Sequence, residues 1–103
     1  MNHFHRTTVP PGAALAEADA FFPTIGMQRT AGAAHTRRFE GIVGEPAEQA
    51  TLDLSVKMEG GHYTFVEART SAQGESRLDR GVKNYFTRLH KMADPRYALS
   101  ASY

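Results

Sequence analysis

The chain has 103 residues, of which 41% are hydrophobic and 22% are charged, and its formal net charge is +1. This length and balance predict one globular domain and argue against intrinsic disorder, which combines low hydrophobicity with a large net charge. The absence of cysteine excludes disulfides, thiolate nucleophiles and cysteine-ligated zinc sites.

The first predicted elements are a strand and a short helix. Residues 3–9 alternate around Phe4 and are rich in threonine and valine, which favours a strand. Two prolines and a glycine then interrupt the extended pattern. Residues 13–22 have helical spacing of alanine, leucine and phenylalanine, and Pro23 ends that helix.

Three strands are predicted in the middle of the chain. Residues 25–29 and 35–43 predict two strands joined by small residues, and a polar loop follows over residues 44–49. The next strand, residues 51–58, has the clearest alternation. Its inward row is predicted to be Leu52, Leu54, Val56 and Met58.

The register of the following hairpin has two solutions. The two glycines of EGGH supply the positive φ angles of a tight turn into a strand over residues 62–70. An even loop places Tyr63 and Phe65 in the core, whereas a three-residue loop turns Val66 and Ala68 inward and leaves the two aromatic rings on the open face. We favour the first solution, because burying two rings contributes about 2 to 3 kcal/mol each.

A long amphipathic helix is predicted over residues 76–93 and ends before Asp94-Pro95. Ser76 and Asp79 approximate a capping box, and Gly81 indicates the close approach of another backbone. The apolar stripe follows the 3.6-residue period and consists of Leu78, Val82, Tyr85, Phe86, Leu89, Met92 and Ala93.

This order predicts an α+β domain over residues 1–94, with a four- to five-stranded antiparallel sheet and two helices on one face (β-α-β-β-β-β-α). Residues 95–103 form a C-terminal tail. The layout is similar to the half-repeat of TATA-box-binding proteins and to a truncated helix-grip domain. The second resemblance implies a long helix lying across a curved sheet, although the chain is too short for a complete helix-grip sheet with a large ligand cavity.

Charge is segregated along the chain. The net charge is +2 over residues 1–39, −5 over residues 40–75 and +4 over residues 76–103. The predicted C-terminal helix carries a basic ridge opposite its apolar stripe, and Asp79 is the one acid among these bases. We expect this ridge to bind an acidic partner. It consists of Arg77, Arg80, Lys83, Arg88 and Lys91.

Candidates for metal binding and catalysis are weak. His3 and His5 point to the same side of a strand, but two ligands do not make a metal site unless His35 or His62 joins them.

A carboxylate pair for acid–base chemistry would come from neighbouring strands, with His62 as a proton carrier. The candidates are Glu40, Asp53 and Glu67. Carboxylates on alternating strands usually face water, and no established catalytic motif is present. We therefore expect no enzyme activity, no cofactor and no bound metal.

The leading hypothesis is a non-catalytic protein-interaction domain that acts as an accessory subunit of a larger assembly. Residues 59–95 resemble membrane-extrinsic subunits of bacterial photosynthetic reaction-centre complexes, which implies protein contacts, no bound pigment and a location peripheral to such a complex.

The alternatives are a helix-grip carrier of a small ligand or lipid, a nucleic-acid-binding sheet and a small α+β enzyme whose tail completes a ferredoxin-like sheet. Nucleic acid is a disfavoured partner because the basic ridge lacks interleaved aromatic residues. Contact of the ridge with an anionic membrane surface is a further expectation. No segment has the roughly 18 apolar residues that a bilayer requires, so we expect a soluble, cytoplasmic protein.

Overall fold

The computed structural model describes residues 1–43, 48–71 and 76–93. The tail predicted over residues 95–103 lies outside the described residues. The elements are β1 (Asn2–Thr7), α1 (Pro11–Phe21), the short 3-10 helix η1 (Phe22–Ile25), β2 (Met27–Gly32), β3 (Thr36–Val43), β4 (Glu48–Glu59), β5 (Tyr63–Thr70) and α2 (Arg77–Ala93). The predicted α+β class and element order are confirmed.

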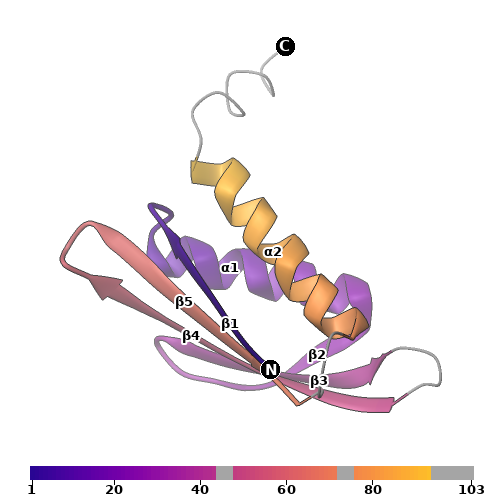
Figure 1. Ribbon diagram of the computed structural model, residues 1–103. Helices are drawn as coiled ribbons and strands as arrows, with labels where there is room; N and C mark the ends of the chain where they lie inside the picture. The colour runs from indigo at the N-terminus through magenta and orange to yellow at the C-terminus, as the bar shows by residue number, and fades with distance from the viewer. Residues whose placement is uncertain (44–47, 72–75, 94–103) are drawn as a thin grey trace.

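The five strands form one antiparallel sheet in the order β1-β5-β4-β3-β2. Helices α1 and α2 both lie on one face of this sheet (Figure 1). Among the described residues, the other face is not covered by any helix. In this part of the chain, the sheet therefore has one face packed beneath helices and one face without them.

The core lies between the two helices and the sheet. Three aromatic rings meet there, with the ring centroid of Phe22 5.1 Å from that of Phe39 and 5.3 Å from that of Tyr85. The Tyr85 hydroxyl donates a hydrogen bond to the Ala14 carbonyl at 2.7 Å, which links α2 to α1. Met58 belongs to the inward row of β4 but is about half exposed.

The connection from α1 to β2 differs from the prediction. The α-helix ends at Phe21, as expected before Pro23, but the chain continues as η1 to Ile25. Gly26 follows with a φ of +90°, a left-handed conformation that glycine adopts without steric cost. The strand therefore begins at Met27, later than the apolar pattern indicated.

The favoured register of the β4–β5 hairpin was wrong. The loop has three residues, and Val66 and Ala68 face the helices while Tyr63 and Phe65 lie on the other side. The helix-facing row of β5 is instead Thr64, Val66, Ala68 and Thr70, all of them buried. Phe65 also keeps part of its burial through contacts on the open side.

Helix α2 confirms the predicted capping box. The Ser76 Oγ accepts a hydrogen bond from the Asp79 backbone N–H at 3.2 Å, and the Asp79 Oδ2 accepts one from the Ser76 backbone N–H at 3.0 Å. The stripe is buried as predicted at Leu78, Val82, Tyr85 and Leu89.

Two details of α2 differ from the prediction. Met92 is about half exposed and does not join the buried stripe. Gly81 is approached by a side chain and not by a backbone, since a Cβ there would lie 2.6 Å from Ile25 Cδ1.

Removing the Tyr85 hydroxyl should destabilise the fold. Tyr85→Phe leaves the Ala14 carbonyl without its buried donor, which should lower the free energy of unfolding by about 1 to 2 kcal/mol. Urea denaturation measures this difference. Tyr63→Phe is the matched control, because Tyr63 is exposed and its hydroxyl makes no buried contact. Equal stability of the two variants would contradict the assigned role of the Tyr85 hydroxyl.

Candidate interaction surfaces

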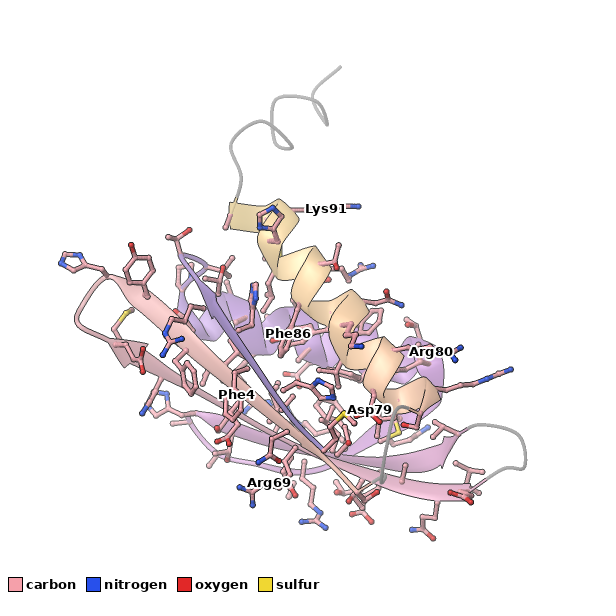
Figure 2. All side chains as sticks on the ribbon, in the orientation of Figure 1. Phe4, Arg69, Asp79, Arg80, Phe86 and Lys91 are labelled. Carbon is pink, nitrogen blue, oxygen red and sulfur yellow. The ribbon has the colours of Figure 1, made fainter. Side chains whose placement is uncertain are left out.

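One member of the predicted basic ridge of α2, Arg88, differs from the others because it pairs with an acid of the same domain. Arg77, Arg80, Lys83 and Lys91 are exposed on α2, and Figure 2 shows Arg80 and Lys91 directed outward from the helix. Arg88 is engaged within the domain. Its Nε lies 2.6 Å from Glu17 Oε1 on α1, and its guanidinium lies 5.2 Å from the Phe21 ring centroid.

The acid that engages Arg88 comes from α1, and not from the acidic middle of the chain. The Arg88–Glu17 ion pair therefore links α2 to α1. Because Glu17 partly neutralises Arg88, this arginine would attract an acidic partner less strongly than the sequence indicated. Arg77 and Arg80 make no ion pair with any described residue. Within residues 1–43, 48–71 and 76–93, these two arginines at the start of α2 therefore keep a charge that Arg88 shares with Glu17.

Arg77 and Arg80 border a groove of about 600 Å³ between α2 and β3. We call it the arginine groove and define it by Ile25, Ile42, Val43, Arg77, Arg80, Gly81 and Asn84. It brings basic and apolar side chains together, a combination that the helical pattern of α2 alone did not reveal.

A second surface is the side of the sheet opposite the helices, here called the open sheet face. Strand alternation places there Asn2, Phe4, Arg6, Thr36, Arg38, Glu40, Ile42, Gln49, Thr51, Asp53, Ser55, Lys57, Glu59, Tyr63, Phe65, Glu67 and Arg69. In Figure 2, Arg69 points away from the helices on this side.

An aromatic pair lies on the open sheet face. Phe4 on β1 stacks on Phe65 on β5, with centroids 5.6 Å apart and planes at 21°. Arg6 and Lys57 approach the Phe65 ring to 4.9 and 5.5 Å, distances typical of cation–π contacts. Phe4 is 56% exposed and Tyr63 is 53% exposed, so these rings remain available for contact.

Charges of both signs surround the aromatic pair. The face carries four bases (Arg6, Arg38, Lys57, Arg69) and four acids (Glu40, Asp53, Glu59, Glu67), so its net charge is zero. The described residues of this face form three ion pairs: Arg6 Nε lies 3.1 Å from Glu59, Arg38 Nη1 lies 3.2 Å from Asp53, and Arg38 Nε lies 3.7 Å from Glu40. A depression of about 410 Å³ borders this region and is lined in part by Arg38, Asp53, Glu67 and Arg69.

The three carboxylates considered for acid–base chemistry all lie on the open sheet face. Asp53 contacts Arg38, and Glu40 accepts a hydrogen bond from the Thr30 hydroxyl at 2.8 Å. Glu67 lies opposite Phe4 in the strand register, and His62 is exposed in the hairpin loop. None of these carboxylates contacts His62 within the described part of the chain, and the pairing with Arg38 and Thr30 favours a structural role.

The two histidines of β1 both face the helices, as strand alternation predicted, but they have different surroundings. His3 Nε2 lies 2.7 Å from Asp79 Oδ1. His5 stacks on Phe86 with centroids 5.0 Å apart, and its Nε2 is buried without a hydrogen-bond partner in the described structure. Burial, with repulsion from His90, lowers the pKa of His5. No group of three His, Asp or Glu residues that could hold a metal occurs in residues 1–43, 48–71 and 76–93.

Asp79 is the most constrained polar group of the described chain. It is fully buried and accepts hydrogen bonds from Ser76 and from the Thr70 hydroxyl at 2.8 Å, besides its contact with His3. Burial alone would raise its pKa, but hydrogen bonds from Ser76, His3 and Thr70 lower the pKa to about 2. Asp79 thus fastens the first turn of α2 to β1 and β5.

Two features were missed by the sequence reasoning. The Phe4–Phe65 stack follows from the three-residue hairpin loop, which the EGGH sequence allowed but did not require. The arginine groove follows from the position of α2 beside η1 and β3. No local signal marks either feature, because each depends on which elements become neighbours.

No protein-family model matches this chain, and no curated protein matches it. No helix in the described part of the chain is both long and apolar enough to cross a membrane.

Protonating Asp79 should destabilise the fold at low pH. Because the folded-state pKa of Asp79 is about 2 and its ordinary value is 3.8, the unfolded state binds more protons between these values. The contribution of Asp79, about 2 kcal/mol, is complete above about pH 5 and is lost as the pH falls towards about 2. Urea denaturation at a series of pH values measures this loss.

Asp79→Asn should be less stable at neutral pH and should lose much of this acid dependence. Asp53→Asn is the matched control, because Asp53 is exposed and contacts a single arginine. An unchanged acid dependence in Asp79→Asn would show that other groups are responsible for it.

Proposed function

We propose that this protein is a non-catalytic protein-interaction domain, an accessory subunit of a larger assembly that docks through its open sheet face. The observation that carries the proposal is the exposed Phe4–Phe65 stack, flanked by Arg6 and Lys57, on a sheet face that no described helix covers.

The composition of this face resembles the centre of a protein–protein interface. Aromatic residues and arginine are enriched there, and a few such side chains supply most of the binding free energy. Phe4 and Tyr63 are each more than half exposed, which leaves apolar ring surface in contact with water. Covering these rings with a partner would remove that surface from water at little conformational cost, because the strands already hold them in place.

A nucleic-acid-binding sheet is the second candidate, because outward aromatic rings on a sheet are able to stack with bases. The charges argue against it. Binding to phosphates requires an excess of basic residues, whereas the four bases of the open sheet face are balanced by four acids. A partner protein whose surface also carries both acidic and basic residues matches the open sheet face better than a nucleic acid does.

The carrier and enzyme alternatives receive less support. Phe22, Phe39 and Tyr85 are fully buried and fill the space between the helices and the sheet, where a helix-grip carrier would hold its ligand. The paired carboxylates on the open sheet face have no described histidine contact for acid–base work.

The nature of the assembly rests on resemblance alone. Because residues 59–95 resemble membrane-extrinsic subunits of bacterial photosynthetic reaction-centre complexes, we include a membrane complex of this kind in the proposal. The open sheet face would then contact the exposed protein surface of that complex.

Co-purification from native cells tests the proposal. The double variant Phe4→Asp/Tyr63→Asp places carboxylates on the exposed rings and should lose the bound protein. Interface aromatics contribute about 2 kcal/mol or more each, whereas substitutions of exposed residues change stability by only about 0.5 kcal/mol. Circular dichroism melting checks that the variant remains folded.

Met92→Asp is the matched control, because Met92 is a similarly exposed apolar residue on α2, away from the open sheet face. It should keep the partner. Retention of the same protein partner by the double variant would refute docking through this face. Loss of the bound material after nuclease treatment would favour the nucleic-acid alternative instead.

A further inference from the structure

The two outer strands of the sheet, β1 and β2, differ in regularity. β2 pairs with β3 through a register shift between Arg29 and Ala31, and it ends at Gly32. Irregularities of this kind keep an edge strand from pairing with another chain. β1 pairs with β5 from Asn2 to Thr7 without any shift, and it contains no proline, lysine or glycine. Of the two edges, β1 is therefore the better template for a further strand.

The hydrogen bonds of β1 define which backbone groups point to its outer edge. The Met1 amino group donates to the Thr70 carbonyl and the Thr70 N–H donates to the Met1 carbonyl, each at 2.9 Å. Because hydrogen-bonded pairs alternate along an antiparallel ladder, every second residue from Met1 onward bonds to β5. The N–H and C=O groups of Asn2, Phe4 and Arg6 point the other way, and no described residue forms a hydrogen bond with them.

This set of edge groups is self-complementary. When two copies of β1 pair antiparallel about Phe4, Phe4 lies opposite Phe4 of the second copy, and Asn2 lies opposite Arg6. Each of these pairs exchanges two hydrogen bonds through groups that point to the edge. Within β1, every other register leaves at least one of the three residues unpaired, and pairing about Arg6 also sets two like charges against each other.

The side chains agree with the register about Phe4. The Phe4 ring, which stacks on Phe65 and is 56% exposed, would be covered by its counterpart, so that two aromatic pairs become one cluster. On the helix-bearing side, His3 lies opposite His5 of the second copy. Burial, with repulsion from His90, lowers the pKa of His5, so His5 is neutral at neutral pH and does not repel its neighbour.

We propose that this protein forms a two-fold symmetric dimer in which the β1 strands of two copies pair and join the two sheets into one. The occupant of the β1 edge is a second copy of this chain, bound through one patch used by both copies. The two open sheet faces then lie side by side on the same surface of the dimer. The dimer does not depend on the docking role of that face, because edge pairing requires no further partner.

Sedimentation equilibrium over a series of concentrations tests the dimer. The wild-type protein should be dimeric and should dissociate on dilution. Arg6→Pro removes an N–H at the outer edge and no hydrogen bond to β5, so it should weaken the dimer at least about tenfold, which corresponds to about 1.4 kcal/mol. Circular dichroism melting checks that this variant remains folded.

Arg6→Ala is the matched control, because it removes the same side chain but keeps the N–H. It should remain dimeric. A wild-type protein that is monomeric at every concentration would overturn the proposal, as would an equal loss of dimer in both variants. Both variants keep Phe4 and Tyr63, so loss of the dimer is distinguishable from loss of docking through the open sheet face.

A single cysteine tests the register and remains informative if the proline variant does not fold. The chain has no cysteine, so a disulfide between two copies of Phe4→Cys joins position 4 to position 4. Hydrogen-bonded pairs of an antiparallel sheet have Cα atoms about 5.5 Å apart, a separation that a disulfide spans. Air oxidation should therefore give a cross-linked dimer on a non-reducing gel.

Arg6→Cys is the control for the cysteine experiment. In the proposed register it lies opposite Asn2 and four residues along the strand from its own counterpart, about 14 Å away, so it should stay monomeric on the same gel. Absence of the cross-link in Phe4→Cys, or equal cross-linking of both variants, would refute pairing about Phe4.

Discussion

The three-residue loop between β4 and β5 controls which side chains the domain buries and which it presents. With this loop, Val66 and Ala68 face the helices, and Phe65 faces outward beside Phe4. A change of one residue in the pairing would exchange these sets. The packed core and the proposed docking face are thus two consequences of the same strand register.

A second constraint fixes α2 on the sheet. Asp79 is hydrogen-bonded to Ser76, directly before its own helix, and to Thr70 at the end of β5, and it contacts His3 on β1. At the other side of the helix, Tyr85 and Arg88 contact α1. These contacts hold the N-terminal half of α2 beside η1 and β3, and the arginine groove exists because of that placement.

Much of the architecture could be predicted from local sequence patterns. The strand alternation of residues 51–58, the helical period of residues 76–93 and the Ser76–Asp79 capping box each depend on neighbours within one element. Their agreement with the structure is therefore expected.

The features that carry the proposed function depend instead on contacts distant in sequence. The partner of Arg88 is Glu17 on another helix, and the stack on Phe65 comes from Phe4 on the first strand. The hydrophobic pattern around the hairpin fitted both registers, and the prediction that favoured burial of the two rings did not count the contacts that Phe65 makes with Phe4, Arg6 and Lys57 on the open sheet face. Composition and periodicity carry no information about such distant pairs.

The antiparallel pairing of β1 with β5 has a consequence for the order in which the chain acquires its structure. The first strand is made first during synthesis, yet its hydrogen-bonding neighbour, residues 63–70, emerges from the ribosome much later, and His3 meets Asp79 later still. Until then the N-terminal segment has no sheet to join. β1 therefore cannot join the sheet before β5 has been synthesised, and closure of this long loop is expected to be a slow step of folding.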